Sequence, residues 1–429
     1  MGRGLLILVS GFVLIVGLVQ KSILDSLKYF PERTTEYHQE MTAKNISTSL
    51  MEYGISEITN NQNWEAGYTD NDFMGAEVSL QVFTFTDFQN NNPDIPSDHN
   101  IQNWDKYTLL LVSEAKTNNA KAVTEVGVTK DAFSKYTYFT DYEPNYIYFY
   151  DGDELNGPVH TNGTMHVAGE PIFNGKVTSP NKWEGHPSYN NNPHFNGGKD
   201  FQSKENEMPD ASKLNLLKNK STNGGLRFND QLRVEFKKNG TVDIFTRANY
   251  YSNWSKAQNY DLDKINGVIS SSKKVYTEGT LKGQVTLHSE NDIEIMGDLT
   301  YFNSDSTSKD MLGIVSENNV VVDDDAHKSG GPSDDYDLNI HASIMALNKS
   351  FKVEDYNSGN PRGTLKVHGG LQQKERGAVG TFSGGSVASG YNKDYTYDKR
   401  LATQFPPFYP RESFYSKQYW KEKPIEYLQ

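Results

Sequence analysis

The chain has 429 residues, enough for more than one hydrophobic core, and its 26 Tyr, 21 Phe and 5 Trp are typical of an ordered protein. It has no Cys, which excludes disulfides, thiolate nucleophiles and Cys-ligated zinc. A formal net charge of −13 argues against nucleic acid as a partner, because such binding needs a basic surface.

The N-terminus carries an uncharged, mostly apolar run from Leu5 to Val19, preceded by Arg3. The run is short for a complete membrane span and has the length of a signal-peptide core. The residues that follow, Gln20 to Leu24, lack the small side chains of a secretory cleavage site. We therefore expect the segment to remain in the protein as a membrane anchor.

A stripe of larger side chains continues at helical spacing beyond this run. The spacing alternates between four and three residues at Ile23, Leu27, Phe30, Thr34, Tyr37 and Met41. The pattern predicts a single helix from Leu5 to about Thr59, with a kink at Pro31. Gly54 and the pair Asn60-Asn61 mark its expected end.

These features resemble the type IV pilin-like proteins, in particular the PilX-type minor pilins. The resemblance rests on Arg3-Gly4 before the apolar run, on Pro31 and on the stretch 43–46. It implies that a prepilin peptidase cleaves after Gly4 and leaves Leu5 as the first residue of a helix that enters a membrane or a filament core. Pilins usually have Glu as the fifth mature residue, where this chain has Val9. A plain, uncleaved signal anchor is the alternative.

Three candidate strands follow the helix. Ala76, Val78, Leu80 and Val82 alternate with polar residues, and an apolar run occurs at 109–112. Val123, Val126 and Val128 supply the third candidate strand. The Asn-rich segment 90–103 predicts a loop between the first two strands. We expect a small antiparallel sheet packed on the helix, and we place this pilin-like domain at residues 1–140.

Two unrelated pairs of segments in the following region repeat at one shared offset. Ser289 to Ile295 recurs as Ser316 to Val322, and Leu338 to Ser343 recurs as Leu365 to Gly370. Short strands at one offset, separated by Gly and Asn, favour a parallel β-helix or a similar solenoid. The fold class is therefore predicted as mainly β with one long N-terminal α-helix. We place a β-solenoid ectodomain at residues 141–395, with a loop insertion near 182–220.

A second resemblance covers roughly residues 140–415. It rests on the stretches 340–347, 369–373 and 376–382 and on an ending with Arg400-Leu401 and Pro406-Pro407. These are similar to an uncharacterised family of bacterial proteins with pilin-like N-termini, which implies no established activity.

Residues 396–429 form an aromatic and Pro-rich tail, which we expect to cover the last turn of the solenoid as a cap. Tyr415, Tyr419 and Trp420 are the candidate binding residues of this tail. The functional alternative to a cap is a contact surface for carbohydrate or for another subunit.

Clustered carboxylates in one Gly-containing loop are the candidate metal ligands, and a hard Ca²⁺ ion would be the cation they suit. The candidates are Asp323, Asp324, Asp325, Asp334 and Asp335, with Asp337 close by. Solvated loop charge is the alternative interpretation. His341 and His368 occupy equivalent repeat positions, which predicts stacked side chains in a hydrogen-bonded ladder or, alternatively, a metal pair.

The sequence has no G-x-S-x-G elbow, H-E-x-x-H helix, P-loop or dinucleotide-binding motif. We therefore expect a non-enzymatic, structural or adhesive protein of the bacterial cell envelope, with no resident cofactor. It would be anchored in the inner membrane or carried in an extracellular filament, with other pilin-like subunits or itself as partners and surface carbohydrate as a further candidate. The alternatives are a polysaccharide-degrading β-helix enzyme and an assembly factor for a pilus or pseudopilus.

Overall fold

The computed structural model describes residues 2–102, 104–209, 214–328, 336–383 and 386–428. The chain forms two compact units. Unit 1 comprises Met1–Lys130 and Phe414–Gln429, and unit 2 comprises Asp131–Ser413. The chain therefore leaves unit 1 near the expected boundary at residue 140 and returns to it at its C-terminal end.

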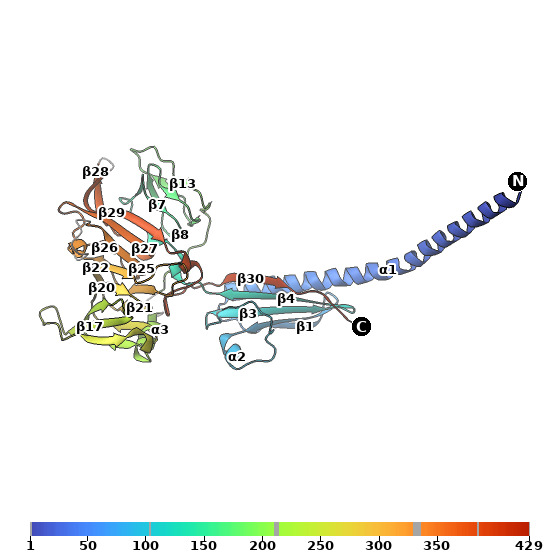
Figure 1. The fold of residues 1–429 in the computed structure, drawn as a ribbon, viewed down its shortest axis with the longest axis horizontal. Helices are drawn as coiled ribbons and strands as arrows, with labels where there is room; N and C mark the ends of the chain where they lie inside the picture. Colours follow the sequence, from blue (N-terminus) through green and yellow to red (C-terminus); the bar gives the residue numbers. More distant parts are fainter. Residues whose placement is uncertain (1, 103, 210–213, 329–335, 384–385, 429) are drawn as a thin grey trace. The chain divides into compact units, whose positions relative to one another are not determined.

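Helix α1 (Gly2–Asn60) is one continuous helix, as its periodicity predicts. Figure 1 shows that its axis changes direction partway along, which agrees with the kink expected from Pro31. Gly54 does not end the helix. A Cβ atom at Gly54 would lie 2.7 Å from Cδ2 of Leu80, so the glycine allows α1 to approach the neighbouring sheet closely.

The C-terminal half of α1 packs on the antiparallel sheet of unit 1. Its buried side chains are Ala43, Ile46, Ser47, Leu50, Met51 and Ile58. The hydroxyl of Ser47 lies 2.9 Å from that of Thr124, and Ser113 donates a 2.7 Å hydrogen bond to the Ser47 carbonyl. These bonds satisfy polar groups at the dry helix–sheet interface, where an unpaired hydroxyl would be costly.

The sheet of unit 1 has the order β1-β2-β3-β4-β30, and β31 also pairs with β4. Its strands are β1 (Tyr68–Phe73), β2 (Ala76–Phe83), β3 (Thr108–Lys116), β4 (Ala120–Thr129), β30 (Ser416–Glu422) and β31 (Glu426–Tyr427). The three strands expected from sequence lie within β2, β3 and β4, and the antiparallel sheet is confirmed. The short helix α2 (Phe85–Gln89) follows β2 and begins with a capping box between Thr84 and Asp87.

The expected cap at residues 396–429 is wrong for its second half. β30 and β31 are antiparallel to β4 and extend the sheet of unit 1. The reason is that β4 would otherwise present a free edge of N–H and C=O groups, which a returning strand satisfies. The first half of the tail stays in unit 2, where the Pro407 carbonyl accepts a hydrogen bond of 2.5 Å from Thr286.

Unit 2 is built mainly from parallel strand pairs. One ladder runs through ten strands in the order β15-β19-β21-β23-β25-β27-β5-β8-β11-β14. Its members are β15 (Leu226–Phe228), β19 (Val268–Ser271), β21 (Gln284–Ser289), β23 (Met311–Ser316), β25 (Leu338–Ala346), β27 (Pro361–Glu375), β5 (Tyr138–Tyr142), β8 (Val159–Thr161), β11 (Val177–Thr178) and β14 (Lys199–Asp200).

Other strands of unit 2 form further ladders beside this one. A second parallel ladder has the order β16-β20-β22-β24-β26, and β29 extends the pairing of β27. These strands are β16 (Gln231–Phe236), β20 (Val275–Leu281), β22 (Ile293–Tyr301), β24 (Val320–Val322), β26 (Phe351–Val353) and β29 (Ser386–Tyr397). The antiparallel strands are β17 (Thr241–Arg247), β18 (Gln258–Asp261) and β28 (Gly380–Ser383).

The repeat seen in the sequence corresponds to direct strand pairing. Val285 pairs with Leu312, and Leu338 pairs with Leu365, so both pairs keep the offset of the repeated segments. Other successive turns have different lengths, since Val275 pairs with Ile293 across a much shorter stretch of chain. This variation explains why the repeat is visible in only part of the sequence.

Serines hold equivalent corners of these turns. Ser271, Ser289 and Ser316 each donate to a backbone carbonyl, at 2.6, 2.8 and 2.8 Å, and each accepts from the N–H two residues later. The same short polar turn therefore recurs where the chain leaves successive strands of the first ladder.

The segment 182–220 is not a simple loop insertion. It contains β12 (Glu184–Gly185), β13 (His194–Phe195), β14 and most of helix α3 (Asn215–Thr222). The strands β12 and β13 pair in parallel with β9 (His166–Ala168) and β10 (Ile172–Phe173), which in turn pair with β6 (Phe149–Tyr150) and β7 (Glu154–Leu155). Two-residue strands carry no periodic signal, so their pattern in sequence is that of a loop. Short 3-10 helices lie at Phe133–Lys135, Leu262–Lys264, Ala326–Lys328 and Lys399–Ala402.

Strand β27 changes its partner halfway along its length. Its residues up to Gly369 pair with β29, and its residues from Leu371 pair with β5. Two glycines lie at this change. A Cβ atom at Gly369 would lie 1.9 Å from the Ala342 carbonyl oxygen, and one at Gly370 would lie 2.4 Å from that of Tyr136. Glycine is therefore required at both positions, because any side chain would clash with the backbone of a neighbouring segment.

We predict that Gly369→Ala destabilises unit 2 strongly. The backbone at Gly369 has φ +153° and the added methyl group has no space, so the free energy of unfolding should fall by about 3 kcal/mol. Gly359→Ala is the matched control, because Gly359 also has a positive φ but no atom within 4 Å of the added Cβ. Thermal unfolding of both variants measures the difference, and equal losses would contradict a role for crowding.

Candidate functional site

The segment Ile7–Leu27 of α1 is apolar and unburied within the protein. Its mean hydropathy is 2.1. It is the one helix among the described residues that is long and apolar enough to cross a membrane. The expected processing residues Gly4 and Leu5 lie just before this segment, within α1. A bare apolar helix of this length needs lipid or another protein around it.

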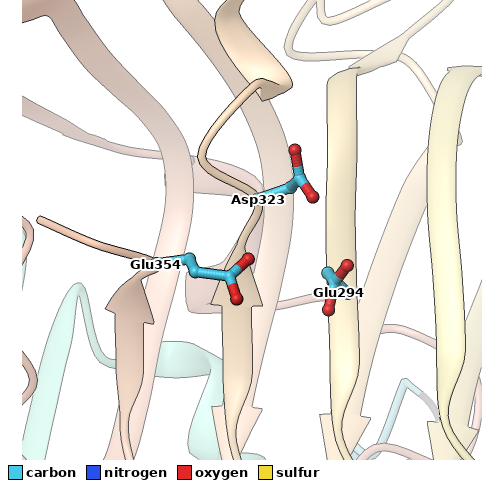
Figure 2. Close-up of side chains that lie close together, drawn as sticks. All are labelled: Glu294, Asp323 and Glu354. Atoms are coloured by element: carbon cyan, nitrogen blue, oxygen red, sulfur yellow. The ribbon is translucent and has the colours of Figure 1, made fainter.

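Three carboxylates from neighbouring turns meet on one side of unit 2 (Figure 2). Glu294 lies on β22, Asp323 follows β24 and Glu354 follows β26, and their oxygen atoms lie within 4.8 Å of one another. Burial, and then the charges of Glu294 and Asp323, raise the pKa of Glu354. Lys274 forms an ion pair with Glu294 and offsets part of the negative charge.

The cluster contains only one of the predicted metal ligands, Asp323. Asp325 instead forms an ion pair with Lys328, and this contact lowers the pKa of its carboxyl group. Asp324 is not part of the cluster, while Asp334 and Asp335 lie outside the described residues. Three carboxylates supply three oxygens if each binds through one atom and six only if all bind through two, whereas Ca²⁺ takes about six to eight, so a Ca²⁺ site here stays a prediction.

The two repeat-related histidines lie side by side, as their positions predict. His341 and His368 are directly paired on β25 and β27, with ring centroids 5.2 Å apart. The N–H of Tyr301 donates to Nδ1 of His341 at 3.3 Å, and Nε2 of His368 lies 3.9 Å from Asp398. Burial, and then the neighbouring His368, lowers the pKa of His341 to about 4. Because Nδ1 of His341 already accepts a backbone hydrogen bond, the arrangement fits a structural ladder better than a metal pair.

This lowered pKa predicts acid sensitivity. The unfolded chain protonates His341 near pH 6.5, whereas the folded chain does so near pH 4, so stability present at neutral pH is lost as the pH falls between these values. The loss attributable to His341 should be about 1 to 3 kcal/mol. His341→Asn, which retains an acceptor near the Nδ1 position, should flatten the unfolding profile measured from pH 7 to pH 4. The same substitution at the exposed His194 should not, and equal slopes for both variants would contradict the assignment.

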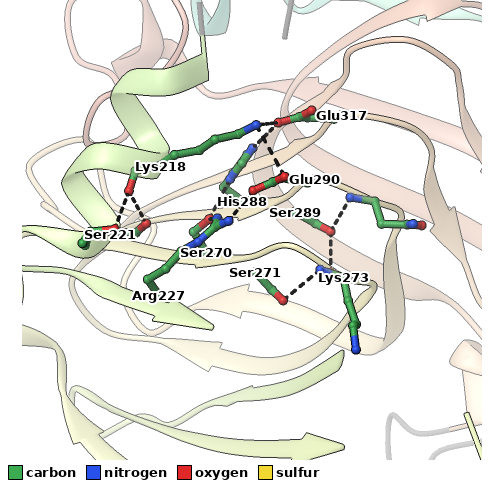
Figure 3. A network of polar contacts seen from close by, with 12 residues as sticks. Lys218, Ser221, Arg227, Ser270, Ser271, Lys273, His288, Ser289, Glu290 and Glu317 are labelled. Carbon is green, nitrogen blue, oxygen red and sulfur yellow. Dashed lines mark hydrogen bonds and ion pairs between the residues drawn. The ribbon is translucent and has the colours of Figure 1, made fainter. Parts of the chain in front are cut away.

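A polar network joins β15, β19, β21 and the residue after β23 to α3 (Figure 3). Ser270 Oγ lies 2.8 Å from Nδ1 of His288, whose Nε2 lies 3.3 Å from Glu317. Lys218 of α3 lies 2.8 Å from Glu317, and Arg227 of β15 donates to Ser270 at 2.7 Å. This network was not predicted from the sequence. The one related observation there was the repeated Ser-Glu-Asn motif, to which Glu317 belongs.

The network contains the residue types of a hydrolase triad, but its burial rules out that role for Ser270. Ser270 and His288 have no exposed surface, and the serine hydroxyl already accepts a hydrogen bond from Arg227. A nucleophile must reach its substrate and be deprotonated by its base. Burial lowers the pKa of His288, which keeps the ring neutral. The network therefore stabilises successive turns and holds α3 against them.

The aromatic residues predicted as a binding surface are partly buried in unit 1. Trp420 and Tyr415 pack against the core between the sheet and α1, whereas Tyr419 packs on the opposite side of the sheet. A Cβ atom at Gly127 would lie 2.4 Å from the Tyr419 ring, so β4 has a glycine where this ring crosses it. Lys423 forms an ion pair of 2.5 Å with the buried Glu125 and completes the attachment of the C-terminal segment.

We predict that Tyr419→Ala combined with Trp420→Ala lowers the thermal stability of the full chain. Removing two packed aromatic side chains from β30 should cost about 3 kcal/mol or more in total, because both rings cover apolar surface of the sheet. Tyr427→Ala is the control, since that ring is 65% exposed. An unchanged melting temperature with weakened attachment or assembly would instead favour a contact surface.

Comparisons with known proteins do not assign a function to the chain. Residues 112–181 match the model of a family described as a domain of unknown function (DUF4900). No functionally curated protein matches the sequence. Among solved structures, the chain is similar to the competence-associated pilin ComZ from Thermus thermophilus, at 10% identity, over 85% of this chain and 87% of that chain. The TM-score is 0.35, too low to establish a shared fold.

Proposed function

We propose that this chain is a membrane-anchored, pilin-like protein of the bacterial cell envelope, with a structural or adhesive role. The observation that supports this most is the division of α1 into two halves. The segment Ile7–Leu27 is apolar and unburied, whereas residues from Ala43 onward pack on an antiparallel sheet. At about 1.5 Å per residue the apolar segment matches the about 30 Å hydrocarbon core of a bilayer.

The exposed apolar half of α1 supports pilin-like subunits, or further copies of this chain, as partners. An apolar helix that leaves a membrane must find an equally apolar environment, which a bundle of similar helices would supply. We propose inner-membrane anchoring or incorporation in an extracellular filament as the two locations. A role as an assembly factor for a pilus or pseudopilus is compatible with the same anchor.

We further propose that unit 2 is a β-solenoid ectodomain that binds without catalysing a reaction. Parallel pairing at repeated offsets and the recurring serine turns support a solenoid. The burial of the Ser270–His288–Glu317 group supports binding over hydrolysis, because that grouping has no access to a substrate. A polysaccharide-degrading enzyme is the alternative, and it would have to use carboxylates elsewhere on unit 2.

Processing of the N-terminus tests the proposal. In cells that contain a prepilin peptidase, we expect cleavage after Gly4, so that mass spectrometry of the native protein finds Leu5 as the first residue. Gly4→Val should abolish this cleavage while the protein remains in the membrane fraction. Gly2→Val is the matched control and should be processed normally. An intact Met1, or a first residue beyond Val19, in the unsubstituted protein would contradict pilin-like processing.

A further inference from the structure

Unit 2 contains a cavity of about 790 Å³ at the place where β27 changes its partner. Strand β29 pairs with the first half of β27 and β5 with the second half, and residues of all three strands line the cavity. Most of the remaining lining comes from the segments 146–155 and 376–382, with Asp337, Phe351 and Tyr356 in addition. The cavity is therefore a consequence of the topology, because two strands that follow different halves of β27 leave space between them.

Aromatic rings form part of the wall. Tyr146 is 72% exposed and Phe382 is 37% exposed, and both line the cavity. Tyr150 stacks on Phe382 with ring centroids 6.1 Å apart and an interplanar angle of 26°. Rings of this kind supply flat apolar area at low entropic cost, which suits the apolar faces of sugar rings.

Charged side chains in the lining are already paired. Lys393 lies 2.7 Å from Asp153, and the two side chains are only 15% and 13% exposed. Lys366 lies 2.5 Å from Asp337, and the buried Arg376 lies 3.2 Å from Glu143. Each cation of the described lining thus has a carboxylate partner, and these pairs still offer donors and acceptors to uncharged hydroxyl groups.

The position of Lys393 is unusual for its residue type. It is paired on β29 with Leu365, a fully buried core residue of β27, so it occupies an inward-facing position. Burial is the main cause that lowers the pKa of its amine. A lysine in an apolar interior is costly even when it is paired, and such groups gather at functional sites.

The charge of the lining discriminates between ligand classes. Four carboxylates face three cations, since the lining contains Asp153, Glu154, Asp337 and Asp394 against Lys366, Arg376 and Lys393. An anionic ligand such as a uronate or a phosphate would meet no unpaired cation in this described lining. An uncharged ligand with many hydroxyl groups would meet both aromatic faces and polar pairs.

We propose that this cavity binds a neutral oligosaccharide, with sugar rings against Tyr146, Tyr150 and Phe382 and hydroxyl groups at the Lys393–Asp153 pair. The inference rests on the proposed adhesive role and deepens it by assigning a ligand class to unit 2. It places the carbohydrate site in unit 2 and not at the aromatic tail of unit 1.

The experiment uses the purified full chain in a polyoxyethylene detergent, which has no sugar headgroup that could compete. Isothermal titration calorimetry with cellohexaose, chitohexaose, maltohexaose and mannohexaose should find binding by at least one of them. Tyr146→Ala and Phe382→Ala should each weaken that binding by about tenfold. Tyr251→Ala is the matched control, because this tyrosine is 94% exposed and lies outside the cavity, and it should leave the affinity unchanged.

Three outcomes would overturn the site. These are no binding of any of the four hexasaccharides, equal affinity of the Tyr146→Ala, Phe382→Ala and Tyr251→Ala variants, and tighter binding of a hexamer of galacturonate than of the neutral sugars. Unchanged thermal unfolding of the variants establishes that they are folded. The length of the oligosaccharides in the same mixtures is also measured, because shortened sugars would contradict the non-enzymatic role but not the binding site. Cleavage after Gly4 tests the pilin-like proposal and depends on neither of these results.

Discussion

The hydrogen bonds between β27 and β5 join the last turns of unit 2 to its first strand. The chain enters unit 2 at Asp131, builds the short strands from β5 to β14, and then starts again at β15 on the far side of the same ladder. Each later strand of this ladder pairs in parallel with the one before it until β27 reaches β5. Without this pairing the two series of turns would each end in an open edge, which exposed backbone groups make unfavourable.

The crowding at this junction explains the side chains around it. Glycines at 369 and 370 allow the backbones to approach, and two buried glutamines tie the strands together. The amide of Gln372 donates to the Tyr136 carbonyl at 3.0 Å, and Tyr409 donates to its oxygen at 2.7 Å. The Gln373 oxygen accepts from the Phe351 N–H at 2.9 Å. The same change of partner also opens the cavity, so the structural constraint and the proposed ligand site have one origin.

Parallel pairing of successive strands brings polar residues together. Register places His341 beside His368, and Glu290 and Glu317 both face Lys218. Such columns concentrate like charges or rings, and the chain balances them with Lys, Arg or backbone donors from neighbouring elements. The carboxylates around Glu354 are balanced only in part by Lys274, and burial with the charges of Glu294 and Asp323 raises the pKa of Glu354.

The sequence by itself determined the elements whose signal is local or repeated. The stripe along α1, the alternation from Ala76 to Val82 and the shared offset of the repeated segments all depend on side-chain periodicity, and the structure contains each of them. Only the tertiary structure decided that β30 joins β4, that Gly54 lies against Leu80 of the sheet, and that Lys393 meets Asp153. These features depend on contacts between residues far apart in the chain. Edge pairing, backbone crowding and charge pairing across such distances produce no periodic pattern of side chains in the sequence. They depend on which groups the assembled strands bring within contact distance.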